Sequence, residues 1–402
     1  MISVDTLPDD VLLGIFDQYV NDAVQFFPER ERAWQSLVRV CRRWRSVIFG
    51  SPRHLNLQLV CQERTPTRDM LDIWPALPLN IWCYGARHYQ IGSVDNIIAV
   101  LERSDHVCRI ILPHVSNSDM EILLAAMQRP FPKLTDLLLY SHGETMPVVP
   151  DSFLGGSAPL LETLQLLHIP FPGLPKLLLF AAHLVKLHIV YIPHSGYITP
   201  NAMVSALSAL TSLKHLSLEF QSPRSCPDQA SRHFPPSTRY VLPILKSFRF
   251  KGVTEYLEDL VARIDAPRLN NLFLTFFNDI IFDAPQFMRF ISRTPTLRAL
   301  EKANLIFWNR NAGLHFSSQT SGDGNVNVEI LCQGLDWQLS SLEQVCTSCL
   351  PPLYMSEDLY IYEGRDSQPD WKDDITPVYC REESLPIRAI CTTYRACPAR
   401  AR

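Results

Sequence analysis

The chain has 402 residues, 47% of them hydrophobic and 19% charged, which is enough apolar content to bury one or more sizeable cores. Its 37 lysine and arginine residues nearly balance its 41 aspartate and glutamate residues, so the net charge of −4 excludes a global electrostatic attraction to nucleic acid. The 11 cysteines follow no regular framework, and apolar stretches such as KLLLFAAHL are too short to span a membrane. With an acidic N-terminus and no Asn-x-Ser/Thr acceptor, the sequence predicts reduced thiols and a cytoplasmic or nuclear location.

The first predicted element is a short amphipathic helix that begins near Pro8, in LPDDVLLGIFDQYV. Pro8 suits the first helical turn, and Asp9 and Asp10 favour the positive end of the helix dipole. The apolar residues of this segment recur at helical spacing and form one stripe: Val11, Leu12, Ile15, Phe16, Tyr19 and Val20.

A second amphipathic helix is predicted from Trp34, because apolar residues again recur three and four positions apart. The residues on its apolar face are Trp34, Leu37, Val38, Cys41, Trp44 and Ile48. Gly50 and Pro52 are expected to end this helix. Since both tryptophans lie at buried-stripe spacing, we interpret them as core residues and not as stacking surfaces for a ligand.

An arginine cluster accompanies this second helix. Seven arginines lie within residues 30–53, with only Glu29 and Glu31 as nearby acids. They are compatible with a solvated helix face, with a rim that contacts an acidic partner, or with nucleic-acid binding. Nucleic acid is disfavoured because no aromatic residues alternate with the arginines to stack on bases. The other two interpretations stay open.

Residues 4–50 resemble an F-box, the helical motif that docks a ubiquitin-ligase substrate receptor onto its Skp-type adaptor. The resemblance rests on Leu-Pro before an amphipathic helix, an Ile-Phe pair one turn later, and the subsequent VCRRWR. The whole chain is similar to a large family of fungal F-box proteins, in which VCRRWRSVIFGSPR and then LNLQLVC are typical. The resemblance implies that the adaptor is bound by Leu7, Pro8, Leu12, Ile15, Phe16, Val40, Cys41, Trp44 and Arg45.

Strand-like alternation begins at HLNLQLV, where Leu55, Leu57 and Leu59 are expected on one side. After residue 100 an apolar-x-x-apolar-x-apolar frame recurs. Clean units begin at positions 107, 134, 161, 184, 213, 245 and 269, and partial units begin at 297 and 356. Their spacing of 23 to 32 residues, with a proline often just before the unit, predicts divergent leucine-rich repeats of one strand and one returning segment. A sheet of unrelated short strands is the alternative.

Helical patterns lie between these strands, in SVDNIIAVLERS, SDMEILLAAMQ, TPNAMVSALSAL, VTEYLEDLVARI and APQFMRFISRT. The predicted fold class is α/β: a small N-terminal helical F-box followed by a curved leucine-rich-repeat-like solenoid, with parallel strands inside and helices outside. The repeat leucines expected to point inward are Leu137, Leu164, Leu187, Leu216 and Leu272. The predicted domains are the F-box at 1–50, a connecting segment with the first strands at 51–100, the array at 101–375, and an irregular tail at 376–402.

Two segments interrupt the repeats, residues 221–243 and 309–327, both rich in Pro, Ser, Gly and Asn. They are predicted to be long exposed loops, which either bind a partner or are tolerated insertions. After about Ile375 the composition changes abruptly, with three cysteines, five arginines and no helical or alternating period. Residues 377–402 are therefore predicted to be mobile and to derive from an altered reading frame or an alternative terminal exon.

Catalytic motifs are absent from the sequence: there is no phosphate loop, no Gly-x-Gly-x-x-Gly after a strand, no His-Glu-x-x-His and no Gly-x-Ser-x-Gly. The histidines in or beside repeat segments, His168, His183, His188 and His215, are interpreted as structural. Cys346 and Cys349, with Cys380, Cys391 and Cys397 downstream, could in principle bind zinc. We interpret Cys346 instead as a packed residue of the helix LSSLEQVCTSCL.

The expected function is that of a substrate-recognition subunit of a cullin-type ubiquitin ligase. In this interpretation the F-box binds the Skp-type adaptor, the repeats bind a protein substrate, and the other subunits of the ligase carry out the chemistry. No catalytic residue, cofactor or metal is expected in this chain, and neither a membrane nor nucleic acid is an expected partner. The alternative is a repeat-based scaffold or interaction protein without a role in ubiquitination.

Overall fold

The computed structural model divides the chain into two compact units, Met1–Leu161 and Glu162–Arg402. Within them the structure describes residues 7–26, 33–52, 54–55, 57–61, 71, 76–82, 94–141, 147–225, 239–277, 285–298, 302–307, 311–317, 324–331, 358–364 and 375–378.

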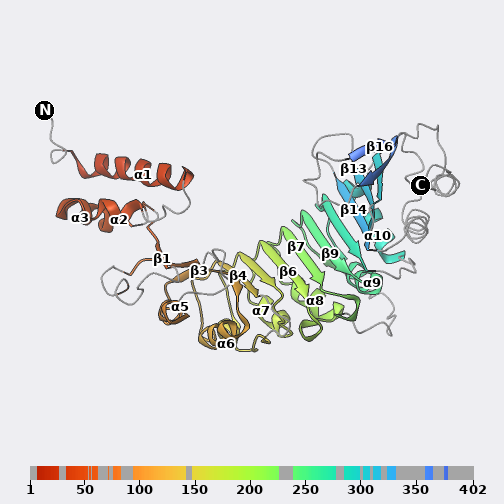
Figure 1. Ribbon diagram of the computed structural model, residues 1–402, viewed down its shortest axis with the longest axis horizontal. Helices are drawn as coiled ribbons and strands as arrows, with labels where there is room; N and C mark the ends of the chain where they lie inside the picture. Colours follow the sequence, from red (N-terminus) through yellow and green to blue (C-terminus); the bar gives the residue numbers. More distant parts are fainter. Residues whose placement is uncertain are drawn as a thin grey trace. The chain divides into compact units, whose positions relative to one another are not determined.

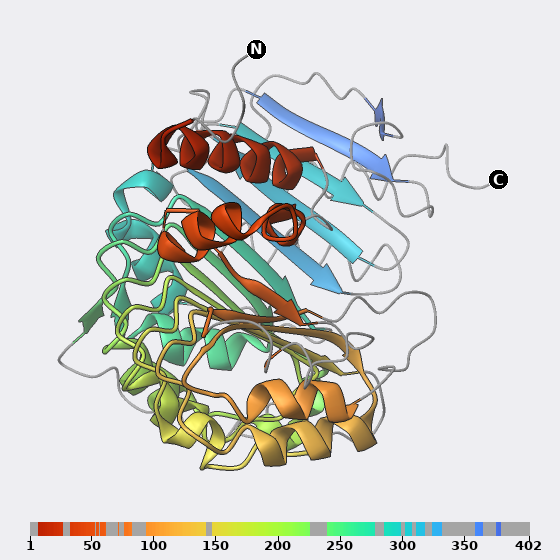
Figure 2. The ribbon, with the colours of Figure 1, turned by 90° about the vertical axis from the view of Figure 1, so that its left-hand side faces the viewer.

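The first unit begins with three helices, α1 (Asp9–Phe26), α2 (Ala33–Leu37) and α3 (Arg42–Gly50). Helix α1 runs alongside α2 and α3 and contacts both (Figures 1 and 2). It begins directly after Pro8 with Asp9 and Asp10 in its first turn, as predicted, but its 18 residues make it much longer than the short helix expected.

The prediction of one continuous helix from Trp34 is wrong, because a turn at residues 38–40 separates α2 from α3. The backbone of Cys41 is extended, with φ −155° and ψ 170°, so a helix cannot run through it. Its Sγ instead accepts the backbone N–H of Trp44 at 3.5 Å and caps α3. Helix α3 ends at Gly50, as predicted.

Aromatic residues fill the interior of this helical segment. Phe16 and Trp34 are buried, and their rings face Trp44 and Phe49 with centroids 4.7 Å and 6.2 Å apart, respectively. The indole Nε1 of Trp34 also donates to the carbonyl of Gln58 at 3.1 Å. Trp34 is therefore a core residue with its polar atom paired, as predicted, whereas Trp44 is only half-buried.

The remainder of the first unit is a parallel sheet with helices. Its strands lie in the order β1 (Leu59–Cys61), β2 (Leu79–Trp82), β3 (Val107–Val115) and β4 (Asp136–Ser141), with helices α5 (Val94–Leu101) and α6 (Asn117–Ala126) in the connections. Ser116 caps α6 by accepting the N–H of Asp119 at 3.2 Å. The strand predicted at HLNLQLV is shorter than expected: it begins only at Leu59, although Leu55 and Leu57 are buried as well.

The second unit holds a large, mostly parallel sheet. The strands β5 (Thr163–Leu167), β6 (Lys186–Ile192), β7 (His215–Phe220), β9 (Ser247–Gly252), β11 (Asn271–Phe276) and β14 (Asn325–Leu331) are parallel neighbours in this order. The sheet continues through β13 (Asn311–Ser317), β12 (Lys302–Phe307), β15 (Asp358–Gly364) and β16 (Ile375–Val378). Of these later neighbours, only β12 and β15 are parallel.

Short helices follow the strands of the second unit. They are α7 (Leu174–Leu178), α8 (Pro200–Leu207), α9 (Thr254–Val261), α10 (Pro285–Arg293) and α11 (Pro295–Arg298). Helices α7, α8 and α9 lie on the same side of strands β6, β7 and β9 (Figure 1). The side chain of Thr199 accepts the N–H of Ala202 at 3.3 Å and caps the start of α8.

The positions of the repeat units in the sequence agree with the positions of these strands. Six of its clean units, those at positions 134, 161, 184, 213, 245 and 269, place a strand two residues after the unit begins, and the unit at 107 coincides with the start of β3. The five leucines expected to point inward, Leu137, Leu164, Leu187, Leu216 and Leu272, are all buried. The architecture is therefore mixed α/β with a large parallel sheet and helices, which is consistent with a repeat-like fold.

Two predictions for the second unit are wrong. Residues 309–327 were expected to be an exposed loop, but they supply β13 and the start of β14, with Ala312, Leu314 and Phe316 buried on alternate positions. The partial unit at 297 was expected to be a strand, but Leu297 lies in α11 and the strand β12 begins only at Lys302.

Other predictions fall largely outside the described residues. Residues 226–238 of the first predicted loop, the helix around Cys346, and residues 379–402 of the tail are among them. The beginning of the tail is described: residues Ile375–Val378 form β16, which pairs antiparallel with β15. Mobility of the tail after residue 378 stays a prediction.

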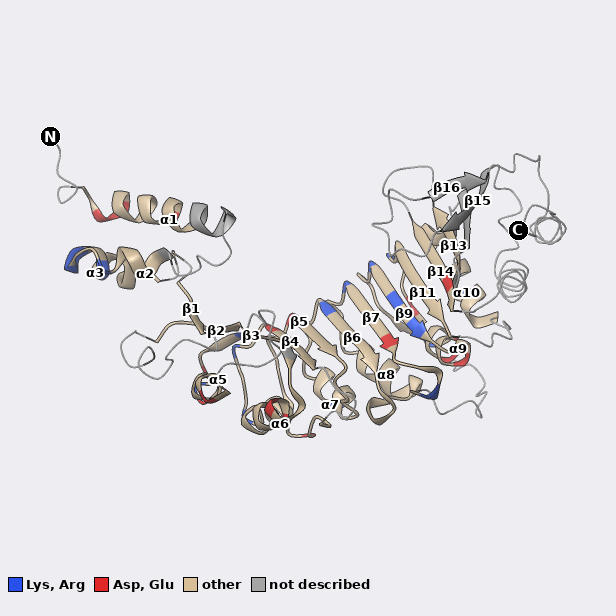
Figure 3. Ribbon diagram, in the orientation of Figure 1, with Lys and Arg blue, Asp and Glu red and all other residues tan. Residues whose placement is uncertain are grey.

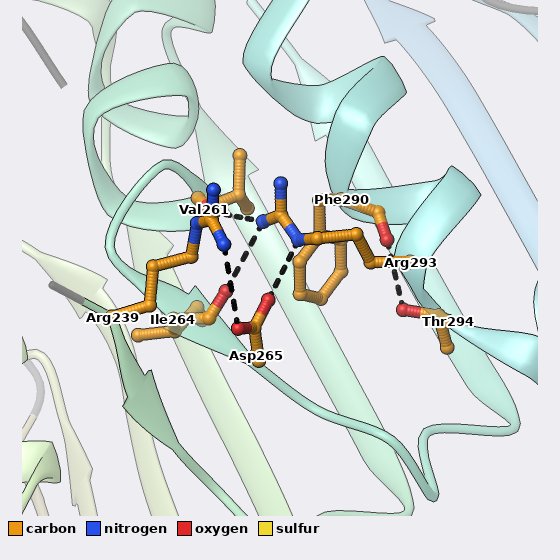
Figure 4. Close-up of polar contacts among 7 residues, drawn as sticks. All are labelled: Arg239, Val261, Ile264, Asp265, Phe290, Arg293 and Thr294. Carbon is orange, nitrogen blue, oxygen red and sulfur yellow. Dashed lines mark hydrogen bonds and ion pairs between the residues drawn. The ribbon is translucent and has the colours of Figure 1, made fainter. Parts of the chain in front are cut away.

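Polar contacts join consecutive repeats on the helix side of the second unit. The Asp265 carboxylate, in the short strand β10 (Ile264–Asp265), accepts the Nε–H of Arg293 at 2.7 Å and lies 3.9 Å from the guanidinium of Arg239 (Figure 4). The Glu258 carboxylate of α9 accepts the backbone N–H groups of Gln286 and Phe287 at 2.9 Å and 2.7 Å, which caps the N-terminus of α10.

Candidate protein-binding surface

Helix α1 exposes a row of apolar side chains. Val11, Ile15 and Tyr19 are 43%, 50% and 47% exposed, and their four-residue spacing places them on one face of the helix. We call these three residues the α1 stripe. Large apolar side chains that gather on a surface in this way are typical of protein interaction sites.

The opposite side of α1 explains why the stripe is not part of the core. Leu12 and Phe16 follow Val11 and Ile15 by one position each, and both are fully buried against the other helices. One helix therefore carries two parallel apolar rows, of which the inner row stabilises the helical segment and the outer row faces solvent.

The start of α1 is held in place by α3. The Arg43 guanidinium donates to Asp9 Oδ1 from Nη2 at 2.8 Å and from Nε at 3.2 Å, and Nη2 also donates to the carbonyl of Leu7. Leu7 is half-buried, whereas Pro8 is exposed next to it. This contact fixes the Leu-Pro pair relative to the second half of the predicted motif.

The second half of the predicted site is divided between surface and interior. Val40 is 60% exposed in the turn between α2 and α3, and Arg45 is exposed while its Nε donates to the carbonyl of Val38 at 3.0 Å. Cys41 and Trp44 are half-buried, the first as the cap of α3 and the second against Phe16.

The nine predicted site residues therefore fall into three groups. Pro8, Ile15, Val40 and Arg45 lie on the surface, Leu7, Cys41 and Trp44 are half-buried, and Leu12 and Phe16 are interior. The sequence-based site omitted Val11 and Tyr19, which are as exposed as Ile15. Their spacing was visible in the sequence, but the helical period alone does not tell which half of a broad apolar stripe faces the core.

The arginine cluster is partly structural. Arg43 pairs with Asp9, and Arg45 binds a backbone carbonyl, while Arg39 and Arg42 are exposed. Figure 3 shows these basic positions at the start of α3, beside acidic positions at the start of α1.

Titratable groups elsewhere respond mainly to burial. Burial lowers the pKa of His188, and the positive charges of His215, Lys186 and Arg249 lower it further. The pKa of His315 is lowered by burial, and that of the Cys108 thiol is raised by burial. A raised pKa lowers the thiolate fraction of a cysteine at neutral pH.

The described residues hold neither a metal-binding cluster nor a membrane-spanning helix. They contain no group of three or more His, Cys, Asp or Glu side chains arranged to hold a metal ion. None of the helices within these residues is long and apolar enough to cross a membrane. The five cysteines that the sequence offers for zinc, Cys346 and Cys349 among them, lie outside the described residues.

Comparison with known proteins gave no relative: the chain matches no protein-family model and no curated protein sequence. Any functional assignment therefore depends on the residues themselves, and the feature that they offer is a helical segment with an exposed apolar row and a firmly held Leu-Pro start.

Proposed function

We propose that the chain is a substrate-recognition subunit of a cullin-type ubiquitin ligase, of the kind found among fungal F-box proteins. Residues 4–50 bind a Skp-type adaptor, the repeats of residues 101–375 bind a protein substrate, and the adaptor links both to the ligase. The chain itself performs no catalysis in this proposal.

The α1 stripe is the observation that carries the proposal. Its three side chains are about half exposed on a helix whose other face is fully packed, so a partner gains apolar burial without disturbing the core. Completing the burial of each side chain contributes on the order of 1 kcal/mol. The stripe includes Ile15, and its helix begins directly after Pro8; the F-box resemblance assigns both of these residues to the adaptor.

The second half of the proposal assigns the repeats to substrate binding. We propose that they form a curved leucine-rich-repeat-like solenoid, with the strands on its inner face. Buried leucines at the repeat positions and helices along one side of the strands support this architecture. A sheet of this kind offers a continuous surface on which alternate side chains of many strands are available to a partner.

Adaptor binding is tested by replacing Val11, Ile15 and Tyr19 together with serine in the full chain. Affinity for a purified fungal Skp-type adaptor, measured by biolayer interferometry, should fall about tenfold or more. Because the replaced side chains are exposed, the thermal unfolding transition should stay close to that of the wild type.

The chain offers a matched control for this variant. Val148, Ile122 and Tyr240 are 50%, 48% and 47% exposed, so the same residue types can be replaced with serine at similar exposure elsewhere. This control variant should bind the adaptor within about twofold of the wild type. Wild-type adaptor affinity in the α1-stripe variant would contradict the proposed F-box.

A scaffold that binds through its repeats is the second candidate. The two functions differ in their effect on the partner, because a ligase subunit directs its partner to degradation and a scaffold does not. If the steady-state abundance of a protein that co-purifies with the chain rises when the chain is removed, the ligase role is supported. Unchanged abundance and an unchanged half-life favour the scaffold.

A further inference from the structure

The strands of the second unit bear a row of cations on the face that their buried residues leave open. In β6, β7 and β9 the alternate apolar positions are buried. The positions between them are half-buried or exposed, except that Ser217 of β7 is buried. The basic residues of this face and of the strand starts are Lys186, Lys214, Lys246, Arg249 and Lys251. Figure 3 shows them at the starts of β6, β7 and β9 and along β9. We call these five residues the basic row.

Three of these cations, Lys186, Lys214 and Lys246, lie close enough together to lower the pKa of one histidine, His215. Lys246 donates its backbone N–H to the carbonyl of Lys214 at 2.8 Å, so the two lysines occupy equivalent positions before adjacent strands. Lys186 pairs in register with His215, the first residue of the next strand. Burial lowers the pKa of His215, and the charges of Lys186, Lys214 and Lys246 lower it further.

Two acidic side chains on this face, those of Glu219 and Glu329, already have partners. Glu219 lies 4.0 Å from Arg249, accepts the hydroxyl of Ser217 at 2.8 Å, and has a side chain that is 15% exposed. Glu329, on β14, accepts the hydroxyl of Thr275 at 3.3 Å. Glu219 lies beside both basic residues of β9, since it is near Arg249 and pairs in register with Lys251. Lys186, Lys214 and Lys246 at the strand starts therefore stay available to an external anion.

Aromatic rings hold two of the cations in position. The guanidinium of Arg249 lies 5.1 Å from the ring centroid of Phe273, and Lys251 Nζ lies 5.7 Å and 5.8 Å from the ring centroids of Tyr191 and Phe277. Such contacts restrict the side chains before a ligand arrives, which lowers the entropy cost of binding.

The type and spacing of the cations identify the ligand class. Four of the five are lysines, which act as separate point charges, and the one arginine is paired with Glu219 and stacked on Phe273. A single phosphate favours a bidentate arginine fork, whereas charges spread over adjacent strands about 4.8 Å apart suit several separate carboxylates.

We infer that the basic row binds an extended acidic segment, a run of aspartate and glutamate, of a partner protein. This inference rests on the proposed function, because it names the class of substrate that the repeats receive. Successive side chains on one side of an extended peptide are about 6.7 Å apart, somewhat more than the spacing of the strands. The long, flexible lysine side chains can take up this difference, so a peptide that crosses the strands presents carboxylates within their reach.

The test uses the full chain and a fluorescein-labelled peptide of alternating glutamate and serine, about twelve residues long and about 40 Å when extended. Fluorescence anisotropy should detect binding of this peptide and none of a peptide with glutamine in place of glutamate. The variant Lys214→Glu/Lys246→Glu should bind the glutamate peptide about tenfold more weakly. Because both lysines are exposed, thermal unfolding should be unchanged.

A charge-matched control separates the site from the overall charge. Lys133→Glu/Arg289→Glu reverses two exposed cations that are not part of the basic row and should stay within about twofold of the wild-type affinity. Equal binding by wild type and Lys214→Glu/Lys246→Glu overturns the inference. Tighter binding of a singly phosphorylated serine–glutamine peptide, or of an oligouridine of equal charge, overturns it as well.

The same anisotropy assay distinguishes a failure of this inference from a failure of the proposed function. The α1-stripe serine variant should bind the glutamate peptide like the wild type. Peptide binding without adaptor binding rejects the F-box and retains the basic row, whereas adaptor binding without peptide binding rejects the basic row alone.

Discussion

Arg43 and Asp9 form an ion pair of 2.8 Å across 34 positions of sequence, and through it the start of α3 holds the start of α1. The same guanidinium binds the carbonyl of Leu7, immediately before Pro8. Arg43, which in the sequence belongs to the arginine cluster, therefore holds the Leu-Pro pair in place through hydrogen bonds to Leu7 and Asp9.

Arg43→Met should loosen the first turn of α1. The pair is largely exposed, so we expect a loss of stability of about 1 kcal/mol or less, most of it from the hydrogen bond to Leu7. Hydrogen exchange of the amides in the first turns of α1 should accelerate. In Arg42→Met, which removes the adjacent exposed arginine, hydrogen exchange of these amides should match the wild type. Equal exchange in the two variants would argue against a role of Arg43 in holding the start of α1.

Leu187→Ala should destabilise the second unit by about 2–5 kcal/mol, because Leu187 is completely buried in β6. In a repeat array the loss of hydrogen-exchange protection should extend to the paired strands β5 and β7, whose Leu164 and Leu216 lie in register with it. Val190→Ala, at a half-buried position of the same strand, should cost far less. Loss of protection confined to β6 would be evidence against a solenoid.

Asp265→Asn should lower the thermal stability of the second unit. The substitution leaves Arg293, whose side chain is 25% exposed, without its carboxylate, and the expected loss is about 1–3 kcal/mol. Arg293→Lys provides the matched change, because it keeps the charge and loses the planar donors that also bind the carbonyls of Val261 and Ile264. Differential scanning calorimetry should place this variant between Asp265→Asn and the wild type.

The histidines predict a dependence of stability on pH. Burial is the largest cause that lowers the pKa of His188, His215 and His315 below the ordinary value of 6.5, so the unfolded chain binds more protons than the folded chain below that value. Their contribution to stability is complete above about pH 6.5 and is lost as the pH falls through the lowered pKa values.

Urea unfolding at about pH 7.5 and about pH 5.5 measures this effect. In the wild type the urea midpoint should be lower at the acidic pH. His188→Gln should reduce the difference between the two midpoints, since glutamine does not titrate. A difference as large as that of the wild type would exclude His188 as a contributor.

Much of the fold followed from apolar spacing. The buried leucines recur because each strand must place the same positions into the core, and the helices between them show a helical period and capping residues such as Ser116 and Thr199. Local rules of this kind act over a few residues and are therefore visible in the sequence.

Three features could not be predicted, because sequence signals for different structures conflicted or because the feature depends on packing against residues far away in the sequence. The turn before Cys41 was missed because the apolar spacing continued through it, and a thiol cap is a weak signal. The strand β13 was missed because Asn, Gly and Ser outweighed the alternation of Ala312, Leu314 and Phe316. In the candidate site, the packing of Leu12 and Phe16 against other helices decided which residues of α1 stayed exposed.

The strand order after β11 has a consequence for how the chain folds as it is synthesised. Strand β11 ends at Phe276, but its parallel neighbour β14 is complete only at Leu331, 55 residues later (331 − 276), since β12 and β13 come first in the chain. At about 5–20 residues per second, synthesis of that interval takes roughly 3–11 s. During this time the outer edge of β11 has no native partner, so the nascent chain should be most prone to aggregation, and most dependent on chaperones, while this segment leaves the ribosome.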